Sequence, residues 1–194
     1  MFPDLLRKSL AGVVELSPGQ VEALEAHYQL LLRWNRVLNL TSITRMEEAV
    51  ERHYCESLFL GTHLPQGRLR IADVGSGAGF PGVPVAVLRP DCSVTLIESH
   101  QRKAVFLREA SRNLPNVRVL ARRAEDVNEQ FDWAISRAVS YKDLASFLKN
   151  LAPNVDLLTG GEEPPDGIGF VWQTPIPVPW SRQRFLRTGH QCFT

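Results

Sequence analysis

The feature that most constrains this chain is a short apolar run at 69–74 that breaks into four glycines, reading IADVGSGAGFPG over 71–82. The apolar run predicts a buried strand, and the glycines fall where a helix is expected to begin. Glycines at such a turn let a ligand approach main-chain N–H groups with no Cβ in the way. A dinucleotide fingerprint, G-x-G-x-x-G, requires glycine at position 80, where this chain has Phe80. An ordinary glycine-rich turn is the alternative interpretation.

Composition indicates an intracellular globular protein. A chain of 194 residues with 44% hydrophobic content can bury one good core, so we expect one domain with an appendage. No apolar run approaches the roughly 18 residues of a membrane span, and the start lacks the pattern of a signal peptide. We therefore expect a cytoplasmic protein without membrane association. The cysteines are too far apart for a metal site, and none is predicted: Cys55, Cys92 and Cys192.

Periodicity predicts two regions, an N-terminal helical extension over 1–65 and an α/β core over 66–194, packed as a single unit. In the extension, amphipathic patterns predict one helix at 18–36, which Ser17 caps, and another at 44–64, which Thr44 caps. The core alternates strands with helices, including one that Ser99 caps, which predicts βαβ units and a mostly parallel, Rossmann-like sheet of seven strands. The predicted strands are 71–74, 93–97, 117–120, 132–136 and 155–158, with 169–173 and 184–187 as a closing antiparallel pair around a proline-rich loop.

Polar residues follow these strands at the edge where parallel sheets bind ligands. Glu98 stands where an acid holds a ribose diol, because a carboxylate can accept both hydroxyl hydrogens. It fits S-adenosylmethionine and NAD equally, and a solvent-exposed acid is the other interpretation. Ala124-Glu125 can offer an N–H and a carboxylate to an adenine edge, or can simply begin a helix. Asp73 can hold N–H groups of its own turn or bind an ammonium group through water.

The pattern D-x-G-x-G-x-G, formed by Asp73, Gly75, Gly77 and Gly79, is typical of Rossmann-like S-adenosylmethionine-dependent methyltransferases. Further motifs make the resemblance specific, and the chain resembles the bacterial 16S rRNA guanine-N7 methyltransferases, the RsmG family, also called glucose-inhibited division protein B (GidB). The resemblance covers roughly 20–150. Its motifs are Trp34-Asn35, Asn39-Leu40-Thr41-Ser42, 52–58, 73–82, Arg102-Lys103, Phe106-Leu107, Phe131-Asp132 and Ser136-Arg137-Ala138.

The resemblance implies methyl transfer from S-adenosylmethionine to N7 of one guanine in 16S rRNA. It places Gly75, Phe80, Ala124, Glu125 and Arg137 at positions that contact the cofactor in the family. Two positions depart from the family pattern. Glu56 replaces an aspartate, and Thr159 stands where the family tends to have a lysine, so we expect a C-terminal tail that diverges from the family pattern.

Guanine N7 has a free lone pair, so its methylation needs no general base, and in-line placement can supply most of the rate. Consistent with this, no Asn/Asp-Pro-Pro-aromatic run follows the fourth strand, and no cysteine nucleophile lies near the glycine loop. We expect Arg137 to position guanine or a phosphate; a structural ion pair is the alternative. His53 is a candidate catalytic residue or a packing histidine, and Asn39 either braces the cofactor loop or satisfies local N–H groups.

Basic residues are concentrated over 101–125, where seven arginines and lysines face two acids. This favours a phosphate-facing patch, although a solvated helix face has the same composition. We expect RNA contacts from Arg52, Arg102, Lys103, Arg122 and Arg123, although Arg52 can instead pair with Glu56 four residues on. The expected partner is 16S rRNA or the small ribosomal subunit, with no DNA, for a monomeric enzyme.

Three other functions remain open from the sequence. A methyltransferase acting on a small molecule or protein would share the loop and Glu98. A nicotinamide-dependent oxidoreductase is disfavoured by Phe80. A non-catalytic RNA-binding relative would retain the fold without the chemistry.

Overall fold

The alternating strands and helices form a parallel sheet, as the sequence predicts. The computed structural model describes residues 1–165 and 168–191. Strand order is β3-β2-β1-β4-β5, and these five strands are mutually parallel. The order reverses between β1 and β4, which is the switch point where sheets of this kind bind ligands. The parallel strands are β1 (Arg70–Val74), β2 (Ser93–Ile97), β3 (Val117–Leu120), β4 (Trp133–Arg137) and β5 (Asn154–Thr159).

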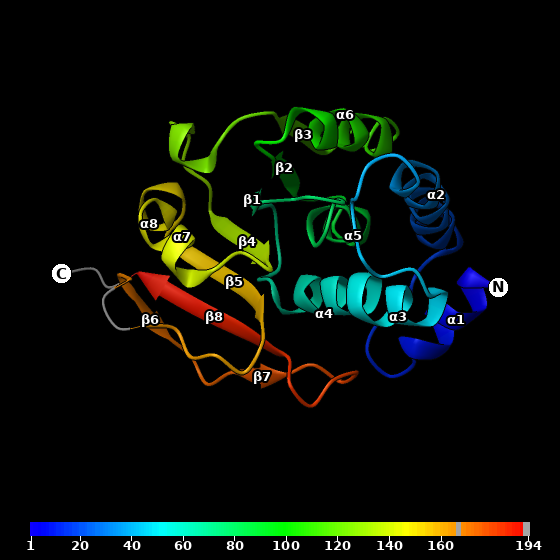
Figure 1. Ribbon diagram of the computed structural model, residues 1–194. Helices are drawn as coiled ribbons and strands as arrows, with labels where there is room; N and C mark the ends of the chain where they lie inside the picture. Colours follow the sequence, from blue (N-terminus) through cyan, green and yellow to red (C-terminus); the bar gives the residue numbers. More distant parts are fainter. Residues whose placement is uncertain (166–167, 192–194) are drawn as a thin grey trace.

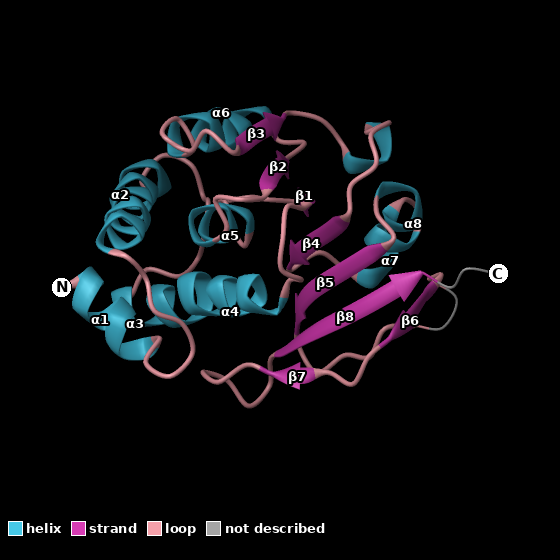
Figure 2. Cartoon of the chain, turned by 180° about the vertical axis from the view of Figure 1, so that it is seen from behind, coloured by secondary structure: helices cyan, strands magenta, loops and turns pink. Residues whose placement is uncertain are grey.

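An antiparallel section extends the sheet beyond β5. β8 (Phe185–Gln191) lies between β5 and β6 (Phe170–Trp172), as Figure 2 shows from behind. β6 and β8 form a closing antiparallel pair, but the predicted pairing of 169–173 with 184–187 is wrong: β6 pairs with residues 189–191, whereas 185–187 lie beside β5 and β7. The expected loop contains an eighth, two-residue strand, β7 (Ile176–Pro177). Proline is tolerated there because β7 lies at the edge of the sheet.

Helices cover both faces of the sheet (Figure 1). α5 (Gly82–Leu88) and α6 (Gln101–Ala110) pack on one face, and α7 (Tyr141–Ala145) and α8 (Leu148–Leu151) pack on the other. A 3-10 turn (Ala124–Asp126) follows β3. The predicted cap Ser99 is wrong: the ring of His100 caps α6 by accepting from the N–H of Lys103.

The N-terminal extension packs on the α5 face. It contains α1 (Phe2–Ser9), α2 (Pro18–Asn35), α3 (Met46–Ala49), a π-helical segment η1 (Val50–Cys55) and α4 (Glu56–His63). Ser17 and Gln20 form the predicted capping box of α2. The predicted cap Thr44 is wrong, because α3 starts after Arg45 with no side-chain cap. None of the described helices is long and apolar enough to cross a membrane.

One apolar core joins the extension to the sheet. Phe2, Leu24 and Tyr54 from the extension belong to the same buried cluster as Leu96 and Ile135 from the strands. A second cluster on the opposite face contains neighbouring strand residues, such as Ala134 and Ile97, with α7 and α8. The alternation follows from the pleat of the strands, which points successive side chains to opposite faces. The extension therefore supplies much of the apolar cover of one face.

A buried ion pair attaches the C-terminal section to the extension. Glu56, at the start of α4, has no exposed surface, and its two carboxylate oxygens accept from Nε of Arg184 at 2.8 and 2.9 Å. The alternative pairing of Arg52 with Glu56 does not form, because Arg52 pairs with Glu48 at 2.9 Å instead. Charge pairs of this kind are costly to break on one side, because the remaining charge stays buried.

We expect Arg184→Leu to lower the free energy of unfolding by about 3–5 kcal/mol, because it leaves the carboxylate of Glu56 buried without its partner. Urea unfolding followed by circular dichroism measures this. Arg182→Leu, an exposed neighbour, is the matched control and should cost well under 1 kcal/mol. Equal losses in the two variants would contradict a stabilising role for the pair.

Candidate active site

The glycine loop between β1 and α5 is held in a conformation that only glycine accommodates. Gly75, Gly77 and Gly79 all have positive φ angles. At Gly79 a Cβ would also lie 2.8 Å from the Val83 side chain and 3.1 Å from Nε2 of His27. The N–H groups of Gly75 and Ser76 both donate to the Ile97 carbonyl at the end of β2. The loop is therefore tied to the switch-point edge of the sheet.

Asp73 lies beneath this loop with no exposed surface. Its Oδ2 accepts from the N–H of Gly82 at 3.0 Å, the first residue of α5. Asp73 therefore holds an N–H of its own turn. A Cβ at Gly82 would overlap this carboxylate. Oδ1 has no hydrogen-bond partner among the described residues, and burial raises the pKa of Asp73 to about 7.

A cleft of about 180 Å³ opens beside the loop. Glu98 forms part of its wall, and the carboxylate is fixed by two backbone donors, Gly77 at 2.9 Å and His100 at 2.8 Å. Each oxygen keeps a further lone pair for a hydroxyl group. Six of the sequence-predicted candidates line the cleft: Gly75, Glu98, Arg122, Arg123, Ala124 and Glu125. The other lining residues are Val74, Ile97, Ser99, Val139, Asp143 and Phe147.

These residues fit S-adenosylmethionine. Exposed main chain at Gly75, an anchored carboxylate at Glu98 and apolar walls at Ile97 and Phe147 suit a ribose with a flat, largely apolar base. The other predicted cofactor residues do not line this cleft. Asp73, Gly79 and Phe80 are buried under the loop and shape it, whereas Gly77 touches the cleft through its hydrogen bond to Glu98.

Phe80 is enclosed by aromatic rings and one cation. His53 stacks on it with ring centroids 4.5 Å apart, while His27 and Tyr54 meet it edge-on at 5.2 and 5.1 Å. The guanidinium of Arg137 lies 5.4 Å from the ring centre. A glycine here, as in a dinucleotide fingerprint, would leave this space empty. Phe80 is therefore a packing centre of the site.

Arg137 ends β4 and lies against the extension. Its Nη2 donates to Nδ1 of His53 at 2.7 Å, and its Nη1 donates to the main-chain carbonyl of Arg52. No carboxylate lies within ion-pair distance of Arg137 in the described chain, so the arrangement is not a structural ion pair. Burial lowers the pKa of Arg137 to about 10, which keeps it cationic at neutral pH. The next residue, Ala138, has φ of 61°, a strained conformation for alanine.

The protonation of His53 follows from its partners. A guanidinium only donates, so Nδ1 accepts from Arg137, and Nε2–H donates to Oγ1 of Thr41 at 2.8 Å. Burial, followed by the charge of Arg137, lowers the pKa of His53 to about 2. His53 is therefore neutral and has both ring nitrogens occupied. It lies in the π-helical segment η1, a type of distortion that is frequent at functional sites.

Asn39 is exposed, and a neighbouring asparagine satisfies the local N–H groups. Oδ1 of Asn35 accepts from Leu40 and Thr41 at 2.8 and 3.0 Å, and its amide donates to the Thr41 carbonyl. Hydrogen bonds therefore connect Asn35, Thr41, His53 and Arg137 in series. Asn35 and Thr41 belong to the family motifs, but the sequence does not reveal their place in this hydrogen-bonded series. Only the folded chain brings residues 41 and 53 together.

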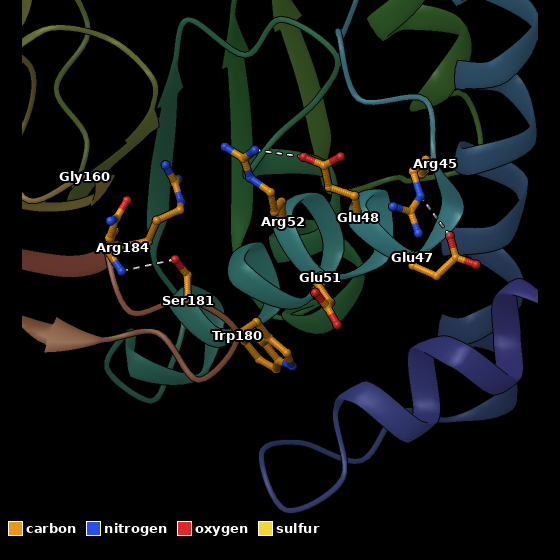
Figure 3. Close-up of a pocket in the computed structure, with 10 residues that line it drawn as sticks. Arg45, Glu47, Glu48, Glu51, Arg52, Gly160, Trp180, Ser181 and Arg184 are labelled. Carbon is orange, nitrogen blue, oxygen red and sulfur yellow. Dashed lines mark hydrogen bonds and ion pairs between the residues drawn. The ribbon is translucent and has the colours of Figure 1, made fainter.

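The basic candidates divide between two places. Arg122 and Arg123 are exposed at the cleft beside the glycine loop, and Arg102 with the half-buried Lys103 lies on the first turn of α6. Arg52 instead lines a larger pocket of about 610 Å³ (Figure 3). Its walls come from segment 45–52 on one side and from Gly160 and 180–184 on the other. The ion pairs Arg45–Glu47 and Arg52–Glu48 balance much of the charge in this pocket.

A guanidinium lies beside Thr159, the position that departs from the family pattern. Nε of the buried Arg187 donates to Oγ1 of Thr159 at 3.1 Å, and its terminal nitrogens bind the two oxygens of Glu163. Arg187 comes from β8, so its position depends on the antiparallel section. The end of β5 therefore carries a buried cation without a lysine at 159. No group of three metal-ligating side chains occurs in the described ranges.

Strand order, glycine loop and cleft define the class. The fold matches a SAM dependent methyltransferase from Aquifex aeolicus with a TM-score of 0.58, 16% identity and coverage of 75% of this chain and 93% of that one. It also matches Aeropyrum pernix fibrillarin in complex with natively bound S-adenosyl-L-methionine, with a TM-score of 0.55, 13% identity and coverage of 69% and 72%. The chain has the Rossmann-like fold of S-adenosylmethionine-dependent methyltransferases.

The sequence comparisons give the family. Residues 20–159 match the family described as rRNA small subunit methyltransferase G, GidB. Ribosomal RNA small subunit methyltransferase G of Chromobacterium violaceum is 42% identical over 74% of this chain and 70% of its own length. That of Methylobacillus flagellatus is 44% identical over 83% and 82%. The chain belongs to the rRNA small subunit methyltransferase G family, and it is an S-adenosylmethionine-dependent methyltransferase.

The buried Asp73 predicts a pH dependence of stability. Its pKa in the folded protein is about 7 against an ordinary 3.8, so the folded state holds the proton more tightly than the unfolded state. The contribution of this tighter proton binding to the free energy of unfolding is fully present below about pH 4 and is lost as the pH rises through 7. We expect the wild type to lose stability relative to Asp73→Asn at up to about 1.4 kcal/mol per pH unit in that window.

Urea unfolding of both proteins from pH 4.5 to 8 measures the difference, since Asn retains an acceptor for the N–H of Gly82. Asp126→Asn, which removes an exposed carboxylate, is the control and should run parallel to the wild type. Parallel curves for Asp73→Asn as well would contradict a raised pKa at Asp73.

Proposed function

We propose that this chain transfers a methyl group from S-adenosylmethionine to N7 of a guanine in the 16S rRNA of the small ribosomal subunit. The bound cofactor supplies an electrophilic methyl group on a sulfonium. We further propose that the enzyme acts as a monomer in the bacterial cytoplasm. The observation that carries the proposal is the position of Arg137 at the end of β4. Its guanidinium contacts Phe80 of the glycine loop and donates hydrogen bonds to residues 52 and 53 of the N-terminal extension.

The residues of the site suit a reaction that needs no base. His53 is neutral, with a pKa near 2, and both its nitrogens are engaged, so it does not accept a substrate proton at neutral pH. Guanine N7 has no proton to lose. Cys55 and Cys92, the cysteines in the described part of the chain, are buried and not positioned as nucleophiles. The catalytic task of the chain is then to hold two reactants in line.

We propose that Arg137 performs the positioning and that His53 orients it. The hydrogen bonds that Arg137 donates to His53 and that His53 donates to Thr41 fix the plane of the guanidinium. A guanidinium donates in a planar fork, which suits guanine O6 or a phosphate. Asp73, Gly75, Gly77, Gly79, Phe80, Glu98, Ala124 and Glu125 form or shape the cofactor cleft in this proposal, and Asn39 remains a catalytic candidate on the exposed turn.

We expect Arg137→Ala to reduce methyl transfer at least about a hundredfold, because the substrate loses its positioning donor. The assay incubates 16S rRNA or small subunits from a strain lacking the protein with labelled cofactor, and maps N7-methylguanosine by mass spectrometry. Arg108→Ala, on the exposed side of α6, is the control. Unchanged turnover would remove Arg137 from the site, and wild-type labelling of a protein or small molecule alone would overturn the RNA substrate.

Arg122 and Arg123 are proposed phosphate contacts beside the cofactor cleft, with Arg52, Arg102 and Lys103 as further contacts. Replacing both Arg122 and Arg123 with Gln should reduce the slope of log K for RNA against log salt by about 1–2, since each phosphate contact contributes nearly one. Filter binding between 50 and 250 mM salt measures the slope. Arg7→Gln with Lys8→Gln removes equal charge from the exposed side of α1 and should leave the slope unchanged. A wild-type slope in the Arg122/Arg123 variant rejects the assignment.

A further inference from the structure

The glycine loop carries one main-chain acceptor that the extension, not the core, satisfies. Ala78 lies in the middle of the loop and is buried, and its carbonyl oxygen lies 3.1 Å from Nε2 of His27 on α2. No other described residue donates to this carbonyl. A buried carbonyl without a donor is costly, so His27 stabilises this position of Ala78 in the loop.

The orientation of the His27 ring is determined by a second partner. A carbonyl oxygen accepts only, so Nε2 carries the proton, and Nδ1 accepts from the hydroxyl of Tyr54 at 2.8 Å. The His27 side chain is buried, and burial lowers its pKa to about 4, which keeps it neutral. Tyr54 follows His53 in η1 and has no exposed surface. The same π-helical segment therefore orients Arg137 through His53 and His27 through Tyr54.

The His27 ring touches three successive loop residues. Besides the Ala78 carbonyl, Nε2 would lie 3.1 Å from a Cβ at Gly79, and the ring meets Phe80 edge-on. On the other side of Ala78, the N–H of Gly77 donates to Glu98 in the wall of the cofactor cleft. If the His27 ring were removed, a shift of Ala78 into the vacated space would therefore move the N–H of Gly77 that holds Glu98 in place.

From this geometry we propose that His27 is a positioning residue for the cofactor. It holds the Ala78 carbonyl so that Gly77 and Glu98 keep the conformation that binds the nucleoside, and Tyr54 maintains its tautomer. The role rests on the use of S-adenosylmethionine as cofactor and does not depend on the proposed RNA target. The helical extension then contributes directly to cofactor binding through α2, although no residue of α2 lines the cleft beside Glu98.

The test is calorimetric titration of the purified full chain with S-adenosylhomocysteine, which requires no RNA. We expect His27→Leu, which keeps the volume but removes both ring nitrogens, to weaken binding about tenfold. His27→Gln can donate to Ala78 and accept from Tyr54, and should remain within about threefold of the wild type. Tyr54→Phe should lie between them, because the ring keeps its proton on Nε2 without a partner that enforces it.

Trp34→Phe is the matched control for loosening of the extension. Trp34 is also on α2 and donates from its ring N–H to Glu109 on α6 at 2.9 Å, so its loss weakens helix docking without touching the loop. It should leave the affinity unchanged. In turnover assays, His27→Leu should raise KM for the cofactor and leave KM for RNA unaltered.

The outcomes separate the two proposals. If His27→Leu is folded by circular dichroism and binds S-adenosylhomocysteine as tightly as the wild type, the role of His27 is overturned and the cofactor assignment stands. Equal losses in Trp34→Phe and His27→Leu, or no rescue by His27→Gln, also overturn it in favour of a general docking effect. Absence of binding by the wild type overturns the cofactor and His27 together, whereas binding without RNA methylation overturns only the RNA target.

Discussion

The structure depends on how little space lies between β1 and α5. The carboxylate of Asp73 is buried directly under Gly82 and accepts its N–H, and a Cβ at Gly82 would overlap Oδ2 of Asp73, so α5 begins in direct contact with this side chain. That constraint sets the glycines at their positive φ angles and places Phe80 inward. With Phe80 inside, the space around it has to be filled by other segments, and these determine the rest of the site.

Those segments come from the extension. His53 stacks on one face of Phe80, and His27 and Tyr54 meet its edge. The π-helical turn η1 places residues 53 and 54 side by side against the loop, where each supports a different polar group of the site. The N-terminal helices therefore do more than cover the sheet. They fix the direction of the guanidinium at the end of β4 and the conformation of the loop at the end of β1.

The C-terminal section likewise contacts both the sheet and the N-terminal extension. It pairs with β5 in antiparallel fashion, bonds through Arg184 to the buried Glu56, and brings Arg187 beside Thr159. The departure at Thr159 is therefore accompanied by a cation from a different strand. Trp180 also donates to the carbonyl of Ser9, so the loop that precedes β8 is attached to the last residue of α1. The larger pocket of Figure 3 is formed by this closure of the tail over α3 and η1.

By itself, the sequence determined the parallel strands within one residue, the helix 18–36 within one residue, the glycine loop and the acid after β2. These features are local: alternating apolar residues, Ser17 as a cap and glycine spacing act on neighbours in the chain. The strand segment that pairs with β6 and the caps of α3 and α6 were predicted wrongly, because several local solutions compete and long-range packing selects one. The hydrogen-bonded series from Asn35 to Arg137, and the bond from His27 to Ala78, were decided only by tertiary structure. The bond from Arg137 to His53 spans 84 positions and the bond from His27 to Ala78 spans 51. Local sequence patterns do not indicate which buried donor will pair with which buried acceptor over such separations.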